Sequence, residues 1–176
     1  MILSIISAIA NNNAIGKANT LLWNLPADMK HFRETTTGHP IIMGQRTFES
    51  LGIDADGNKG RPLPNRRNIV LTLDREFKRN NIDVFYSIDD LEKNLNKTLE
   101  KDEEAFIIGG GQIYKLFIDK ADKLYITHVN AKFPDADTFF PEIDNNKWEI
   151  TNSEKYPKDE KNIYDLDFKI YKRKSA

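Results

Sequence analysis

The sequence predicts an α/β protein with a single mixed, mostly parallel central sheet, helices on both faces and a C-terminal antiparallel hairpin. Short apolar runs alternate with helical segments over most of the chain, as in strand–helix–strand units. Residues 164–171 instead alternate apolar and polar side chains, and with residues 148–151 they predict a hairpin at a sheet edge. The chain is long enough for one full core and shows no repeat or linker, so we expect a single domain over residues 1–176.

The composition excludes several classes of function. With 26 basic and 27 acidic side chains the net charge is −1, so no overall field draws the chain to nucleic acid or to an anionic membrane. The sequence has no cysteine, which rules out disulfides and thiol chemistry and fits a reducing cytoplasm. Its three histidines, His31, His39 and His128, are too scattered for a metal site. No long apolar run is left over for an interface, so we expect a monomer.

The chain begins with a strand, a loop and a helix. Residues 2–10 are apolar almost throughout and predict a central strand covered on both faces. They lack the positive flank of a signal peptide and are too short to span a membrane. Residues 11–21 form a polar loop, either a lid or an ordinary surface excursion. Asn24 as a cap and Pro26 in the first turn then predict a helix over residues 25–36.

Further strands and helices alternate along the rest of the chain. Apolar runs predict strands over residues 41–43, 68–73, 84–86, 105–108 and 123–129. Helices are predicted after Gly44, after Ser87 as a cap, and from Gln112. Residues 134–141 form an acidic, aromatic loop, and residues 54–59 form a solvated insertion.

One face of the first helix combines apolar residues with a single carboxylate. Spacings of three and four residues place Leu25, Asp28, Met29, Phe32 and Thr36 side by side. An ionised carboxylate on a buried face is costly without a partner, and the cations of this helix point to other sides. Two interpretations follow. Asp28 binds a ligand with adjacent N–H donors, or it only complements the positive end of the helix dipole.

Two strand ends lead into glycine turns that open helices. Residues 109–111 are three glycines between a buried strand and a helix, and Gly44 stands at a similar junction. Such junctions bring backbone N–H groups and a helix N-terminus to a place where an anion can bind. The alternative is a tight turn without a ligand. The later glycine of the Rossmann fingerprint is missing, so that motif does not apply.

Several of these segments together resemble dihydrofolate reductase of the bacterial chromosomal type. The most specific are Leu22-Trp23-Asn24-Leu25-Pro26-Ala27-Asp28 and the strand that runs into Gly109-Gly110-Gly111-Gln112-Ile113-Tyr114. The resemblance follows the family's order over nearly the whole chain. It implies an NADPH-dependent, cytoplasmic enzyme that reduces 7,8-dihydrofolate to 5,6,7,8-tetrahydrofolate by hydride transfer to C6 and protonation of N5. Such an enzyme supplies one-carbon metabolism and thymidylate synthesis and binds antifolate inhibitors.

The resemblance also implies a substrate site. Asp28 would hold N3 and the 2-amino group of the pterin in a paired, charge-assisted hydrogen bond, Thr127 would support the carboxylate, and water would carry the proton to N5. Leu21 and Trp23 complete the catalytic set, in the lid. Arg66 would grip the substrate's α-carboxylate with a planar fork that lysine does not reproduce. The implied substrate-binding residues are Ile6, Ala8, Asp28, Met29, Phe32, Ser50, Leu51, Leu63, Arg66, Ile108, Tyr114 and Thr127.

A cofactor site for NADPH follows from the same resemblance. Its implied residues are Ala8, Ile15, Gly16, Asn19, Leu21, Gly44, Gln45, Arg46, Thr47, Leu71, Thr72, Leu73, Ile108, Gly110, Gly111, Gln112, Ile113 and Tyr114. In the family the peptide bond that corresponds to Gly109-Gly110 is cis.

Around the 2′-phosphate of the cofactor the sequence departs from the family. Gln45, Leu73 and Gln112 stand where a basic residue, a hydroxyl residue and an arginine are common. Arg46 and Arg75 are the charges left to contact that phosphate. Preference for the phosphorylated cofactor is therefore implied by the resemblance and only weakly specified by these residues.

Two other functions remain open at this point. A related reductase of riboflavin synthesis shares the fold and the nucleotide site but acts on a ribosylated pyrimidine, and Asp28 behind Trp23-Asn24-Leu25-Pro26 argues against it. A non-catalytic nucleotide-binding module would bind its ligand through residues 109–111. It would have no use for Asp28 in an apolar face.

Overall fold

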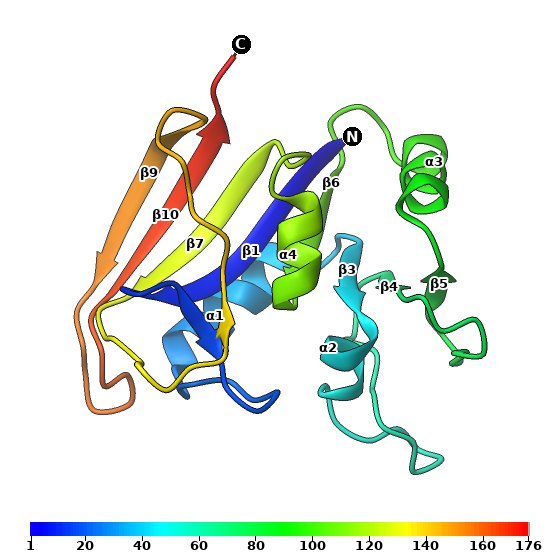
Figure 1. Ribbon diagram of the computed structural model, residues 1–176, viewed down its shortest axis with the longest axis horizontal. Helices are drawn as coiled ribbons and strands as arrows, with labels where there is room; N and C mark the ends of the chain where they lie inside the picture. Colours follow the sequence, from blue (N-terminus) through cyan, green and yellow to red (C-terminus); the bar gives the residue numbers. More distant parts are fainter. Residues whose placement is uncertain (176) are drawn as a thin grey trace.

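A single eight-stranded sheet forms the middle layer of the computed structural model, which describes residues 1–175 (Figure 1). Its strands are β1 (Ile2–Ala10), β3 (Ile41–Gly44), β4 (Asn68–Leu71), β5 (Asp83–Phe85), β6 (Glu104–Gly109), β7 (Lys123–Val129), β9 (Trp148–Tyr156) and β10 (Leu166–Arg173). They lie in the order β5-β4-β3-β6-β1-β7-β10-β9. All neighbours are parallel except β10, which is antiparallel to both β7 and β9. The mixed, mostly parallel sheet with a C-terminal hairpin is therefore confirmed.

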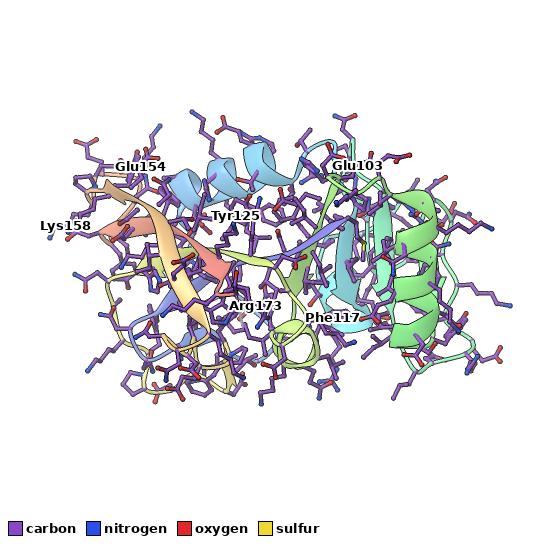
Figure 2. The ribbon with its side chains drawn as sticks, turned by 90° about the horizontal axis from the view of Figure 1, so that it is seen from above. Glu103, Phe117, Tyr125, Glu154, Lys158 and Arg173 are labelled. Carbon is purple, nitrogen blue, oxygen red and sulfur yellow. The ribbon has the colours of Figure 1, made fainter. Side chains whose placement is uncertain are left out.

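Helices cover both faces of this sheet. They are α1 (Pro26–Thr36), α2 (Gln45–Glu49), α3 (Ile88–Thr98) and α4 (Gly111–Phe117). On one face Phe32 of α1 packs in an apolar cluster with Phe106 and Tyr125, and on the other face Leu91 of α3 and Phe117 of α4 share a second cluster. Figure 2 shows α1 on the side of the sheet where Tyr125 lies, and Phe117 on the opposite side.

β1 and β6 stop pairing before they end. Their ladder ends at Ile5 and Ile107, whereas β1 remains paired with β7 as far as Ala10 and Val129. The last residues of β1 therefore have β7 on one side and no longer have β6 on the other. This is the carboxyl edge of the parallel strands, where open α/β sheets bind their ligands.

The strand predicted over residues 68–73 is shorter than expected. β4 ends at Leu71, so its extension to Leu73 is wrong. Thr72 turns the chain, because its hydroxyl donates to Gln45 Oε1 at 2.7 Å and accepts the N–H of Asp74 at 3.1 Å. Leu73 is left 91% exposed.

The loop before α1 and the loop after β7 each contain a short strand that the sequence did not predict. β2 (Ala14–Gly16) and β8 (Thr138–Phe139) pair antiparallel in a small second sheet. Backbone hydrogen bonds flank the pair, from Asp137 N–H to Gly16 O at 3.1 Å and from Phe140 N–H to Asn13 O at 2.8 Å. The loop of residues 11–21 is therefore held by a segment far away in the sequence.

α1 is not capped by Asn24, contrary to the expectation. Its N-cap residue is Leu25, whose side chain offers no hydrogen bond. The N–H of Ala27 donates instead to Oδ1 of Asn162, at 2.9 Å, in the loop between β9 and β10. Asn162 is 3% exposed, and its amide group donates to the carboxylate of Asp159. A residue from a distant loop therefore replaces the local cap.

We expect the substitution Asn162→Ala to lower the free energy of unfolding by about 0.5–2 kcal/mol, which is the usual cost of losing an N-cap. The substitution Asn24→Ala is the matched control and should change it by less than about 0.5 kcal/mol, as at an ordinary surface position. Urea denaturation of both variants measures the difference. Equal losses in the two variants would contradict this assignment of the cap.

Candidate active site

Asp28 lies in the first turn of α1, on the side that faces Thr127 of β7. Burial raises the pKa of its carboxyl group above the ordinary 3.8, while the hydroxyl of Thr127 and the nearby ring of His31 each lower it. Thr127 is 2% exposed and is paired with Ala8 in the β1–β7 ladder. Within residues 1–175 no lysine, arginine or histidine forms an ion pair with Asp28. Asp28 is therefore a half-buried carboxylate beside a single hydroxyl, and none of the described residues 1–175 forms an ion pair with it.

Tyr114 of α4 reaches β1, the strand that pairs with β7 beside Asp28. Its hydroxyl donates to the carbonyl of Ile6 at 2.9 Å. Burial raises the pKa of the phenol, and the negative charge of Asp28 adds to this effect, so the phenol is protonated at neutral pH. Gly109, at φ +123°, leaves space for it, since a Cβ there would lie 3.1 Å from the tyrosine oxygen.

Most of the apolar residues expected to line the substrate lie together. Ile6, Phe32, Leu51, Leu63 and Ile108 belong to the apolar cluster on the α1 side of the sheet. Met29 of α1 is 50% exposed. Ser50 is also exposed, and its hydroxyl donates to the carbonyl of Thr47 at 2.6 Å. The structure thus provides an apolar wall near Asp28, with Met29 and Ser50 on its solvent side.

Arg66 lies over the ring of Phe32, with the guanidinium carbon 6.0 Å from the ring centroid. Burial lowers the pKa of its guanidinium, and the positive charge of Arg33 lowers it further. No carboxylate of residues 1–175 forms an ion pair with Arg66. A half-buried guanidinium without an acidic partner is suited to bind an external carboxylate or phosphate.

Two neighbouring strands, β3 and β6, end in glycine turns that open helices. Gly44 precedes α2 and Gly110 precedes α4, and neither helix start has a side-chain cap. The first N–H groups of both helices are therefore available at one edge of the sheet. A Cβ on Gly110 would lie 3.2 Å from the hydroxyl of Thr47, and the Gly109-Gly110 peptide bond is cis, as the resemblance implied. These N–H groups and the Thr47 hydroxyl fit the phosphates of a dinucleotide.

Other residues expected at the cofactor site belong to the core on the α4 side of the sheet. Ile15, Leu71, Ile113 and Tyr114 lie in one cluster and are each at most 9% exposed. Ile113 packs against one of the glycine turns, because a Cβ on Gly44 would lie 3.1 Å from its side chain. Ala8 is half-buried and packs in a separate cluster on the α1 side.

The edge expected near the 2′-phosphate offers few cations. The amide oxygen of Gln45 accepts the Thr72 hydroxyl at 2.7 Å, and Gln112 is exposed. Arg75 lies over the ring of Tyr86 at 5.0 Å. Arg46, in the first turn of α2, is exposed. Arg46 is therefore the better placed of the two arginines to meet an anion beside the start of α2.

The loop between β1 and α1 lies beside the segment that contains β8 (Figure 1). Asp137 joins the two, because its carboxylate accepts the N–H of Ala18 at 2.8 Å. This bond, together with one from the Thr138 hydroxyl at 2.8 Å, lowers the pKa of Asp137. The carboxylate is therefore ionised at neutral pH and holds the loop against β8.

The residues expected to form the lid lie around the tip of this loop. Ala18 and Asn19 have φ angles of 48° and 60°, as the central residues of a tight hairpin turn do. Leu21 is 66% exposed. Trp23 is half-buried, with its ring 5.5 Å from that of Phe133. The loop thus has a fixed base at Trp23 and an exposed apolar tip at Leu21.

We expect the substitution Asp137→Ala to lower kcat/KM for the reduction that the resemblance implies by about 2- to 10-fold, the effect of one net hydrogen bond. The reason is that the loop of residues 11–21 loses its bond to Asp137. Asp135→Ala in the same segment is the matched control, since Asp135 is exposed. Steady-state kinetics test the rate, and faster hydrogen exchange at the Ala18 amide in the Asp137 variant tests the cause. Identical exchange in both variants would contradict the anchoring role.

Four polar residues that support the site were missed from the sequence as functional residues: Thr36, Asn68, Asp137 and Asn162. Each bonds to a segment that is distant along the chain or on another element. Local periodicity carries no signal for such contacts. The one available hint was a polar residue at the start of an apolar strand, as at Asn68.

Outside this site, the described residues 1–175 offer neither a membrane-spanning helix nor a metal-binding group of side chains. No helix in residues 1–175 has the length and apolarity for a membrane span. No three acidic or histidine residues in the same range are grouped to hold a metal ion. A cavity of about 360 Å³ near the ends of β7, β9 and β10 is lined by His128, Lys155 and Asp167 among others, and none of the expected site residues lines it.

The fold and the site together define a class. Parallel strands that end in glycine turns bind dinucleotides at their carboxyl edge. A half-buried carboxylate that forms no ion pair within residues 1–175, set beside an apolar wall, suits a flat heterocycle with adjacent N–H donors. The class is a dinucleotide-dependent reductase of a heterocyclic substrate.

Comparison with known proteins identifies the family within this class. The family model described as Dihydrofolate reductase matches residues 2–173, and the chain belongs to this family. It is 43% identical over 174 residues to the dihydrofolate reductase of Haemophilus influenzae, covering 99% of this chain and 100% of that protein. It is 41% identical over 174 residues to that of Bacillus subtilis, covering 99% and 96%. A solved structure of Enterococcus faecalis dihydrofolate reductase, complexed with NADP(H) and RAB-propyl, superposes with a TM-score of 0.87 at 35% identity and covers 99% of this chain and 97% of its own.

Proposed function

We propose that this chain reduces 7,8-dihydrofolate to 5,6,7,8-tetrahydrofolate with NADPH, by hydride transfer to C6 and protonation of N5. The observation that carries the proposal is the half-buried carboxylate of Asp28, which faces Thr127 and forms no ion pair with any of the described residues 1–175. Membership of the dihydrofolate reductase family over residues 2–173 supports the same activity. The two other functions considered from the sequence, a riboflavin-pathway reductase and a non-catalytic module, gain no support from either finding.

In this proposal Asp28 binds the pterin ring through a pair of hydrogen bonds, from N3–H and from the 2-amino group. Two parallel bonds to an ionised carboxylate fix the plane of the ring, which orients C6. The negative charge also favours the protonated form of the pterin, and so assists protonation at N5. Thr127 keeps the carboxylate in place, because its hydroxyl interacts with Asp28.

Apolar residues exclude bulk water from the reacting atoms. The cluster of Ile6, Phe32, Leu51, Leu63 and Ile108 forms one wall, and Leu21 of the loop is placed to cover the other side when the loop closes. Asp28 is not the donor to N5 in this proposal. A single water molecule admitted beside the closed loop carries that proton.

The residues that would hold NADPH lie at the carboxyl edge of β3 and β6. The N–H groups at the starts of α2 and α4, with the Thr47 hydroxyl, would bind its pyrophosphate. Arg46 would contact the 2′-phosphate. Bound there, the cofactor supplies the hydride. Gly110 would bring the backbone at the end of β6 close to the cofactor, because it carries no side chain next to the Thr47 hydroxyl.

At the far end of the apolar wall, Arg66 would bind the α-carboxylate of the glutamate tail. Antifolates that carry a diamino heterocycle would occupy the same site as the pterin. We also propose a cytoplasmic monomer. The cysteine-free sequence supports that compartment.

An assay of NADPH oxidation in the presence and absence of dihydrofolate tests the proposed function. We expect oxidation that depends on dihydrofolate and yields one tetrahydrofolate for each NADPH consumed. Oxidation at the same rate without dihydrofolate, or no oxidation with it, would overturn the proposal.

A further inference from the structure

We propose that Thr36 and Asn68 are positioning residues that hold Arg66 ready for the α-carboxylate of the substrate. They would set the affinity for the glutamate tail without contacting the pterin. The inference rests on the role proposed above for Arg66 and adds the two residues that make that role possible.

Asn68 fixes the loop that carries Arg66. It is the first residue of β4, where it is paired with Ile41 of β3, and it is 3% exposed. Its Oδ1 accepts the N–H of Leu63 at 2.9 Å, and its Nδ2 donates to the carbonyls of Leu63 and Arg66, each at 2.9 Å. One amide side chain therefore binds both ends of the loop of residues 63–66. Only asparagine at this position supplies an acceptor and two donors on so short a stem.

Thr36 fixes the guanidinium itself. It is fully buried at the end of α1, its hydroxyl donates to the carbonyl of Phe32 at 2.8 Å, and the same oxygen accepts Nη1–H of Arg66 at 3.0 Å. The Nε–H of Arg66 donates to the carbonyl of Pro64 at 3.0 Å. These two bonds use the N–H of Nε and one N–H of Nη1, and they leave the other N–H groups of Arg66, including both on Nη2, for a ligand.

Apart from the Pro64 carbonyl and the ring of Phe32, the surroundings of Arg66 do not hold its guanidinium in place. Burial lowers the pKa of Arg66, and the positive charge of Arg33, which repels the guanidinium, lowers it further. No carboxylate of the described residues 1–175 attracts it into an ion pair. An untethered arginine side chain would spend most of its time in other rotamers, and a ligand would have to order it on binding. Thr36 and Asn68 remove that cost before the substrate arrives.

The test compares two substrates that differ only in the tail. Dihydrofolate carries the carboxylate, whereas 6-methyl-7,8-dihydropterin presents the same ring without it. We expect Thr36→Val, which preserves the shape of the side chain, and Asn68→Asp, which removes both donors, to raise KM for dihydrofolate by about 3- to 10-fold. Neither variant should change kcat/KM for the methyl pterin by more than about 2-fold. Thr37→Val is the matched control, because the Thr37 hydroxyl donates to the carbonyl of Arg33 and not to Arg66.

The outcomes separate this inference from the proposed function. The variant Arg66→Lys serves as the reference, and it should discriminate between the two substrates more strongly than either positioning variant. If Arg66→Lys discriminates and the Thr36 and Asn68 variants impair both substrates equally or neither, this inference alone is overturned. If Arg66→Lys does not discriminate, the proposed role of Arg66 fails, and the inference fails with it.

Discussion

Replacing Asp28 by asparagine is expected to lower kcat/KM for dihydrofolate by about 10²–10⁴-fold, the range found for removal of a group that governs proton transfer. The amide has the same size and shape as the carboxyl group but has no charge. It also offers an amino group to a ligand edge that itself carries N–H donors, so one of the two paired hydrogen bonds is lost. Steady-state oxidation of NADPH by both proteins measures the loss.

The defect should shrink as the pH falls. At low pH a larger fraction of the substrate is already protonated, so less depends on the charge of Asp28. Wild type and the Asp28→Asn variant should therefore approach each other at the acidic end of the profile. Burial raises the pKa of Asp28, which means that folding favours its neutral form, so the neutral amide should not destabilise the fold at pH 7. Equal rates for both proteins at neutral pH would remove Asp28 from the mechanism.

Replacing Arg66 by lysine is expected to raise KM for dihydrofolate by about 10- to 100-fold, with kcat nearly unchanged. A hydrogen bond between charged groups contributes about 1.5–3 kcal/mol, and an ammonium group cannot form the paired contact of a guanidinium. The tail is bound in the ground state and in the transition state alike, so the loss falls on KM. Substrate titrations at saturating NADPH measure both constants.

Arg67→Lys is the matched control for this variant. Arg67 is the next residue, but its guanidinium donates to Asp83 at 2.6 Å and to Asn94 at 2.8 Å, away from Arg66. The control should leave KM for dihydrofolate unchanged. A rise in KM for Arg67→Lys with none for Arg66→Lys would place the tail on the other side of the loop.

The sheet could be predicted from sequence because its strands are local apolar runs. The predicted strand over residues 123–129 coincides with β7, and Ser87 caps α3 through a bond from the Asp90 N–H to its hydroxyl, as expected. The cap of α1 was wrong for a physical reason. Asn24 has the right chemistry, but the acceptor in the folded protein is Asn162, and sequence spacing carries no information about a contact over that separation.

In the site, too, local sequence patterns could be read, whereas contacts between distant segments could not. Asp28 stands out in the sequence because it breaks an apolar helical face, and the structure places it beside Thr127, as the resemblance implied. The residues that hold Arg66 and the loop do not stand out, because their partners lie on other segments: the guanidinium of Arg66 for Thr36, the Arg66 carbonyl for Asn68 and the Ala18 N–H for Asp137. Sequence reasoning therefore identifies the group that touches the ligand more readily than the groups that position it.

The central claim is that the carboxylate of Asp28 binds a heterocyclic ligand and does not serve to stabilise the fold. A carbon-13 NMR titration of this carboxyl group, with and without a bound 2,4-diaminopyrimidine, tests the claim most directly. Without ligand, its pKa should lie above the ordinary 3.8 because burial disfavours the charge. With ligand, two N–H donors favour the ionised form and the pKa should fall. The same pKa in both states would contradict the account.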